Sequence, residues 1–312
     1  MRIPKSNGLA LMAVFLLAGS AACGRAGATP TATADGQASP VPSATAASVS
    51  ILAVDTKRTL TVGDMTRTCR LHVPAGLSIQ KPAPLVFVFH GFQENGSYAQ
   101  IYTGLDGIAD DNGFIAVYPD GSGSRDLLSW NASGCCGDAL LNDVDEPAFV
   151  RSIIADVQTI AGVDARRTYA TGFSNGALLS YRLACTMSDT FAAVAPVGGT
   201  LTYAPCQPQQ PVSLIDVHGM NDQVVPFEGG GTGIQFPSVK GSLAAWAKLD
   251  NCGAADQGQK DGIMTHITYG GCVPGVSVDL YKVEGVGHGW PPPEVAPVSQ
   301  IIWDFFAAHP KP

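Results

Sequence analysis

The chain has 312 residues, of which 46% are hydrophobic and 14% are charged, and its formal net charge is −8. This length and composition suit one large globular domain with flanking segments. The acidic balance argues against binding to nucleic acid, so we expect no nucleic-acid partner.

The N-terminal segment has the order of features found in export signals. A short positive stretch precedes an apolar run over residues 9–18, which is too short for a comfortable membrane span, and small residues then lead to Cys23. This order resembles a bacterial lipoprotein signal, although Ser20 stands where leucine is usual, and ordinary cleavage after an Ala-x-Ala-like site is the alternative. We expect a signal peptide over residues 1–22 and lipidation at Cys23. Either route exports the protein, as a cell-surface lipoprotein or in secreted form.

Residues 23–50 consist mainly of Ala, Thr, Pro, Ser and Gly. Such a stretch cannot bury enough apolar surface to offset the entropy lost on ordering, which predicts a disordered tether. The remaining residues, 51–312, are expected to form one folded domain without internal repeats.

Hydrophobic patterns along this domain predict strands that alternate with helices. The predicted strands cover residues 58–62, 65–73, 84–89, 114–118, 168–173, 191–197, 212–217 and 276–283. The predicted helices cover residues 146–161, 177–184, 238–249 and 298–308. This alternation indicates an α/β fold with a mostly parallel central sheet and helices on both faces.

The pentapeptide Gly172-Phe173-Ser174-Asn175-Gly176 lies between a predicted strand and a predicted helix. Strand, Gly-x-Ser-x-Gly, helix is the nucleophile elbow of α/β-hydrolases, a sharp turn that projects the serine hydroxyl above the sheet edge. The flanking glycines let the strand and the helix approach each other without a Cβ clash. The sequence therefore predicts the α/β-hydrolase fold, with Ser174 as the nucleophile.

A serine nucleophile needs a base, and the base needs an orienting acid; in this fold their chain order is Ser, acid, His. Asp222 follows a predicted strand on a loop, whereas Asp216 and Asp250 lie in predicted regular elements. His288 lies in a glycine-rich loop directly after the last predicted strand. We expect Asp222 to be the acid and His288 to be the base.

The oxyanion formed during such a reaction needs two N–H donors, and losing one typically costs about 10²- to 10³-fold in turnover. One expected donor is the backbone N–H of Asn175, the residue after the nucleophile. The other is the backbone N–H of Phe92, in the His-Gly-Phe-Gln segment that follows the strand over residues 84–89. Gly91 is the alternative second donor.

Aromatic side chains at loop positions can stack on a substrate, and we expect Trp130 and Trp290 to do so. The acidic loop over residues 142–146 lacks the spacing and the glycine of an EF-hand, so we expect no metal site. No dinucleotide-binding or phosphate-binding motif is present in the sequence.

The chain has 8 cysteines, a number consistent with disulfides in an exported protein. The preferred pairs are Cys185 with Cys206 and Cys252 with Cys272, since each closes a short local loop. Three further cysteines stay open: Cys135 and Cys136 can bridge each other or one can bond elsewhere, and Cys69 is expected to be a buried free thiol on an alternating strand.

Several segments together resemble the exported esterases of the polyhydroxybutyrate-depolymerase and feruloyl-esterase group. They are Cys69–Pro74, Phe89–Gly91, Trp130–Gly137, Gly172–Gly176, His218–Pro226 and Gly287–Pro291. The resemblance runs from about residue 60 to the C-terminus. The chain departs from the group over residues 145–150, where Asp-Glu-Pro-Ala-Phe-Val replaces the usual Asp-Asp-Val-Gly-Phe-Ile, which leaves the shape of the nearby cleft open.

The resemblance implies a serine esterase that hydrolyses carboxylic esters through an acyl-enzyme, with Ser174, Asp222 and His288 in the roles argued above. It also implies disulfides near the two preferred cysteine pairs, and no cofactor. The expected substrates are hydroxyalkanoate oligomers or polyesters, or feruloyl-type esters, and we expect a monomer that contacts a membrane only through a lipid anchor. The alternatives are an acyltransferase on the same fold and a non-catalytic, ligand-binding surface lipoprotein.

Overall fold

A computed structural model describes residues 52–124 and 127–311 of the chain. The expected signal peptide, the lipidation site at Cys23 and the tether over residues 23–50 lie outside the described residues. Among the residues described, no helix is long and apolar enough to cross a membrane.

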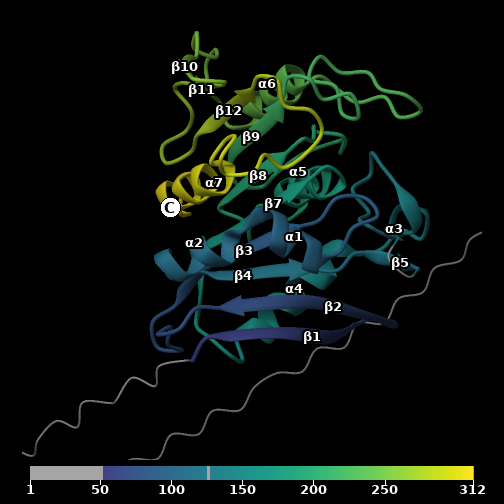
Figure 1. Cartoon of the computed structure of the whole chain (residues 1–312), viewed down its shortest axis with the longest axis vertical. Coiled ribbons are helices and arrows are strands. Elements are labelled where there is room, and N and C mark those ends of the chain that lie inside the picture. The colour runs from purple at the N-terminus through teal and green to yellow at the C-terminus, as the bar shows by residue number, and fades with distance from the viewer. Residues whose placement is uncertain (1–51, 125–126, 312) are drawn as a thin grey trace, which may run out of the picture. The chain divides into compact units, whose positions relative to one another are not determined.

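One large sheet organises the described residues (Figure 1). Its strands are β1 (Val54–Val62), β2 (Met65–Val73), β3 (Ala83–Phe89), β4 (Ile115–Pro119), β7 (Val163–Phe173), β8 (Ala193–Val197), β9 (Ser213–Gly219), β10 (Gln259–Asp261), β11 (Met264–Tyr269) and β12 (Val278–Val283). In this part of the chain the sheet has 10 strands in the order β1-β2-β4-β3-β7-β8-β9-β12-β11-β10. The strands from β4 to β12 in that order pair in parallel, and both edges are antiparallel. A separate two-stranded ribbon joins β5 (Ser122–Ser124) to β6 (Leu127–Ser129).

Helices cover both faces of the sheet. They are α1 (Gly96–Thr103), α2 (Leu105–Asn112), α3 (Gly137–Leu141), α4 (Glu146–Val157), α5 (Asn175–Thr186), α6 (Val239–Leu249) and α7 (Val298–Ala308). One hydrophobic core holds buried residues of α4, α5 and α6, and the other holds buried residues of α1, α2 and α7. The fold is thus a three-layer α/β arrangement, as the sequence predicts.

Strand β3 shows how the sequence builds two cores. All seven of its residues are buried. Leu85, Phe87 and Phe89 point into the core with α5, while Val86 and Val88 point into the core with α7. A continuous apolar run is what a strand covered on both faces requires, because successive side chains leave opposite faces.

The predicted strands and helices are present with small shifts of their ends. The helix predicted over residues 146–161 ends at Val157, and the strand predicted from residue 168 begins at Val163. Helices α1 and α2 are not predicted by the sequence. Each has 8 residues and is followed by a left-handed glycine, Gly104 or Gly113, so neither is long enough to show a clear apolar stripe.

The parallel strands bring distant loops to one edge of the sheet. Phe89 of β3 pairs with Gly172 of β7, so the loop after β3 begins beside the nucleophile elbow. On the other side, Val283 of β12 pairs with Gly219 of β9. The loops that follow β9 and β12 therefore start at the same level of the sheet, which is where the expected acid and base lie.

The cysteines of the described part of the chain form three disulfides. Cys185 bonds Cys206 and Cys252 bonds Cys272, the two pairs that the sequence favours. The open question over Cys135 and Cys136 is resolved, because they bond each other. Cys69 is a buried free thiol, as expected. This set of disulfides indicates a protein that works outside the reducing cytosol.

Removing the Cys185–Cys206 bond should lower the free energy of unfolding by about 3 kcal/mol, because the bond restricts a loop of about 20 residues in the unfolded chain. Reversible urea unfolding of the wild type and of the Cys185→Ser/Cys206→Ser variant measures this change. An unfolding midpoint equal to that of the wild type would contradict the prediction.

Candidate active site

Ser174 lies on the turn between β7 and α5. Its φ is 54° and its ψ is −116°, a backbone conformation that non-glycine residues rarely adopt. The glycines on either side are required by close packing: a Cβ on Gly172 would lie 2.6 Å from the Gly176 carbonyl oxygen, and a Cβ on Gly176 would collide with the Phe89 carbonyl. This is the sharp strand-to-helix turn that the pentapeptide predicts.

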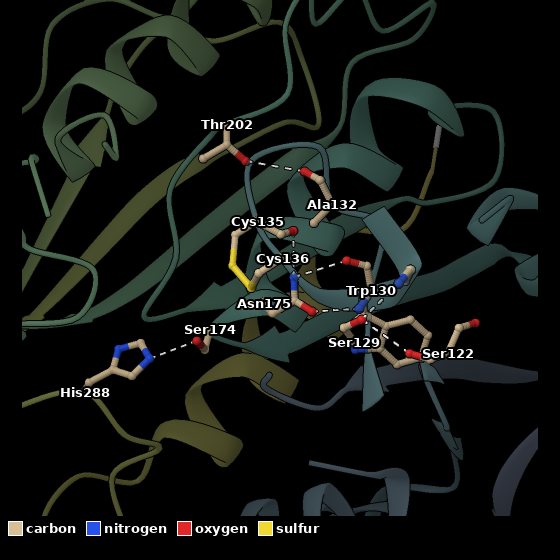
Figure 2. The surroundings of a disulfide bond; sticks show 11 residues. Ser122, Ser129, Trp130, Ala132, Cys135, Cys136, Ser174, Asn175, Thr202 and His288 are labelled. Atoms are coloured by element: carbon tan, nitrogen blue, oxygen red, sulfur yellow. Dashed lines mark hydrogen bonds between the residues drawn. A yellow bond between two sulfur atoms is a disulfide. The ribbon is translucent and has the colours of Figure 1, made fainter. Parts of the chain in front are cut away.

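The structure brings the three expected polar side chains into one hydrogen-bonded row. Nε2 of His288 lies 2.9 Å from Oγ of Ser174 (Figure 2), and Nδ1 of His288 lies 2.7 Å from Oδ2 of Asp222. With the proton on Nδ1, the imidazole donates to the carboxylate and accepts from the serine hydroxyl. The three residues come from the ends of β7, β9 and β12, more than 100 residues apart along the chain at the extremes.

Asp222 is held as a carboxylate by its surroundings. The side chain is buried, and its Oδ1 accepts hydrogen bonds of 2.8 Å from the backbone N–H groups of Val224 and Val225. Burial opposes ionisation, but the hydrogen bond and charge of His288 and these two N–H groups outweigh it and hold the pKa of Asp222 below its ordinary value. An ionised acid at this position can orient the imidazole across the neutral pH range.

The other two aspartates considered as acids lie elsewhere. Asp216 is fully buried and accepts a 2.8 Å hydrogen bond from the hydroxyl of Tyr181. Asp250 follows the end of α6, where burial raises its pKa to about 7. Neither carboxylate hydrogen-bonds His288 in the described residues.

The two expected oxyanion donors have free N–H groups. Within residues 52–124 and 127–311, neither the N–H of Phe92 nor that of Asn175 has an acceptor, whereas the neighbouring N–H groups of Gly91, Gln93 and Ser174 are all bonded. The first N–H groups of a helix have no acceptor within it, and Asn175 begins α5. Free N–H groups at a helix start favour a negative charge nearby.

A pocket of about 280 Å³ opens beside His288. It is lined by Glu94, Tyr98, Tyr102, Phe173, His288, Gly289 and Trp290. Trp290 is partly exposed there, and its Nε1–H donates to the Ser299 hydroxyl at 3.1 Å, which fixes the ring at the pocket wall. Burial raises the pKa of the Glu94 carboxyl, whose Oε2 accepts from the Gly91 N–H at 2.8 Å.

The prediction that Trp130 binds substrate is wrong. Its side chain is 0% exposed, and its ring packs edge-on against Phe89 with centroids 5.2 Å apart. Its Nε1–H donates to the carbonyl of His90 at 2.9 Å. A large ring gains most when it is fully covered and its N–H is bonded, so Trp130 supports the loop after β3 from the core.

Glu94 and Tyr102 are pocket residues that the sequence does not reveal. Tyr98 and Tyr102 are four residues apart on α1, a spacing that places them on one face of a helix. That signal is readable only once α1 is known, and α1 is too short to be predicted.

Among the residues that the structure describes, one group of side chains has the spacing of a metal site: Asp55, His72 and Asp106. These groups already bond protein partners. The His72 Nδ1 lies 2.8 Å from Asp55, and Asp106 accepts hydrogen bonds of 2.7 Å from Gln100 and Tyr118. We read the group as a hydrogen-bonded cluster that ties β1 and β2 to α2.

Comparison with known proteins agrees with this geometry. Residues 67–225, just over half of the 312-residue chain, match the family model described as Esterase PHB depolymerase. The chain belongs to this esterase family. The resemblance inferred from the sequence motifs is confirmed.

Two curated relatives of this esterase are about equally similar in sequence. Feruloyl esterase B of Piromyces equi is 30% identical over 226 residues, which cover 69% of the chain but only 41% of that protein. The chain thus spans less than half of the length of this relative. The putative esterase NocK of Nocardia uniformis subsp. tsuyamanensis is 30% identical over 319 residues, which cover 93% of the chain and 90% of that protein.

Solved structures share the fold. An acetyl xylan esterase from Aspergillus awamori superimposes with a TM-score of 0.57 at 15% identity, covering 80% of the chain and 99% of that structure. The α/β-hydrolase fold predicted from the nucleophile elbow is therefore confirmed.

Proposed function

We propose that the protein hydrolyses carboxylic esters, with Ser174 as nucleophile, His288 as general base and Asp222 as the orienting acid. The observation that carries this proposal is the continuous row of hydrogen bonds from Ser174 through His288 to Asp222, at 2.9 and 2.7 Å. Family membership supports ester hydrolysis as the reaction class.

In the first half of the reaction, Oγ of Ser174 attacks the ester carbonyl carbon while Nε2 of His288 takes the hydroxyl proton. The imidazolium that forms is stabilised by the carboxylate of Asp222. The C–O bond to the alcohol then breaks, and His288 returns the proton to the leaving oxygen. Water repeats the sequence on the acyl-enzyme and releases the acid.

The negative oxygen of each tetrahedral intermediate is assigned to the free N–H groups of Phe92 and Asn175. Donors that are fixed before the reaction stabilise this charge without reorganising, which is usually the largest single contribution to catalysis. The unbonded state of both N–H groups supports this role.

For substrate we propose hydroxyalkanoate oligomers or feruloyl-type esters. The pocket beside His288 holds Tyr98, Tyr102 and Trp290, whose rings can cover an apolar or aromatic group, and its volume of about 280 Å³ suits a small unit. We also propose an exported monomer with a signal peptide over residues 1–22, a tether, a catalytic domain over residues 51–312 and a lipid anchor at Cys23.

A substrate panel with product analysis tests the reaction class. We expect release of free acid from methyl ferulate or from hydroxybutyrate oligomers, without transfer of the acyl group to an added carbohydrate. Preferential formation of an acylated carbohydrate would instead identify an acyltransferase. Absence of turnover and of fluorophosphonate labelling would point to a non-catalytic binding protein.

A further inference from the structure

The segment Trp130–Gly137, which we call the double-cysteine loop, lies against the start of α5 (Figure 2). It carries the bonded pair Cys135 and Cys136. Its contacts reach both residues whose N–H groups are assigned to the oxyanion, although neither of these residues belongs to the loop.

The first contact is made by the side chain of Asn175. Its Oδ1 accepts the backbone N–H of Trp130 at 2.7 Å, and its Nδ2 donates to the carbonyls of Trp130 at 3.3 Å and Cys135 at 3.1 Å. The residue is 1% exposed. The carboxamide is therefore occupied by the loop, while the backbone N–H of the same residue has no acceptor among the described residues.

The second contact involves Phe92. A Cβ on Gly137 would lie 2.8 Å from Cε2 of Phe92, so the ring packs directly on the end of the double-cysteine loop. The chain just before the loop also contacts the Phe92 segment, since the carbonyl of Leu128 accepts the N–H of Gln93 at 2.9 Å. One stretch of chain thus fixes the surroundings of both free N–H groups.

We propose that Asn175 is a positioning residue. Its carboxamide fastens the double-cysteine loop to the start of α5 and thereby orients the two N–H donors toward the oxyanion. This inference rests on the proposed ester hydrolysis. It gives Asn175, the asparagine of the Gly-x-Ser-x-Gly segment, two roles. Its backbone N–H binds the oxyanion, and its side chain holds the surrounding backbone in place.

The physical reason lies in the cost of losing the clamp, by which we mean the three hydrogen bonds between the Asn175 carboxamide and the double-cysteine loop. Without the carboxamide, the buried N–H of Trp130 would lose its acceptor and the Cys135 carbonyl would lose its donor, while the Trp130 carbonyl would keep the N–H of Ala132. Leaving the buried N–H without a partner is unfavourable enough to make the loop shift. Catalytic donors tolerate little displacement, because they must point to where the oxyanion forms. A shift of the loop would therefore weaken binding of the transition state more than binding of the substrate.

The Asn175→Ala variant tests this proposal. We expect kcat for a p-nitrophenyl ester to fall about 10²-fold, the size of losing one oxyanion donor, with little change in KM. The inhibition constant of an alkyl boronic acid, which forms a tetrahedral adduct on the serine, should rise in parallel with the loss of kcat. Ser180→Ala is the matched control: it removes a buried 2.9 Å side-chain-to-carbonyl bond within the same helix and should leave both quantities unchanged.

The Asn175→Asp variant separates the clamp from simple misfolding. It keeps the acceptor for the Trp130 N–H but replaces the donor with an oxygen that faces two carbonyls, so kcat should fall again. The wild-type far-UV circular-dichroism spectrum and a cooperative melt, at a lower temperature than that of the wild type, would show that the variant is folded. The Cys135→Ser/Cys136→Ser variant should lose part of kcat, whereas Cys252→Ser/Cys272→Ser should not.

Wild-type kcat in both Asn175 variants would overturn the proposal, and so would a loss of kcat without weaker boronic acid binding. If the wild type itself has no esterase activity, or keeps it after Ser174→Ala, the proposed function fails instead.

Discussion

Replacing Ser174 with alanine is expected to lower kcat for a p-nitrophenyl ester by about 10⁶-fold, the scale seen when a serine hydrolase loses its nucleophile. The hydroxyl is the atom that attacks, and its Oγ lies 2.9 Å from the imidazole nitrogen that would take the proton. Steady-state kinetics at an enzyme concentration high enough to detect slow turnover, with the substrate still in excess, would measure the loss.

The variant should keep the fold, because the side chain is small and the strained turn depends on the flanking glycines. A circular-dichroism melt compared with the wild type checks this, and Ser180→Ala on the same helix serves as the active control. Activity of Ser174→Ala close to that of the wild type would refute the assignment of the nucleophile.

The second large effect is expected for Asp222→Asn, which should lower kcat by about 10⁴-fold. The amide can keep accepting the N–H groups of Val224 and Val225 through Oδ1, but it turns an N–H toward Nδ1 of His288. The imidazole then carries its proton on Nε2 and can no longer accept the proton of Ser174. The positions of the three side chains are kept, but the imidazole of His288 is in the wrong tautomer.

Asp216→Asn and Asp250→Asn are the comparison variants, because these residues are the other candidates for the acid. Both should keep a kcat much closer to that of the wild type than Asp222→Asn does. Each kcat is calculated from the concentration of active sites found by titration. Loss of turnover in Asp216→Asn with normal activity in Asp222→Asn would show that the acid has been assigned to the wrong residue.

The positions of Ser174, Asp222 and His288 could be predicted because each follows a strand in a parallel sheet. The carboxyl ends of parallel strands meet at one edge, so residues just beyond β7, β9 and β12 converge whatever their separation along the chain. The strong local signal of the nucleophile elbow then fixed which fold to expect. The chain order Ser, acid, His then led to Asp222 and His288.

Other features depend on tertiary packing that local patterns do not encode. Trp130 lies in a loop just before two cysteines, a position that favours an exposed ring. Its ring is nevertheless covered by Phe89 and His90. The clamp made by Asn175 depends on a loop about 40 residues earlier in the chain. The pocket wall formed by Tyr98 and Tyr102 depends on α1, a helix of 8 residues that leaves Tyr98 53% exposed.

The most direct test of the central claim is to find the residue that acts as the nucleophile. Intact-protein and peptide mass spectrometry after reaction with a fluorophosphonate should show one adduct per molecule, on the peptide that contains Ser174, with labelling much slower in His288→Ala. An adduct on another residue, or no adduct in protein that hydrolyses esters, would contradict it.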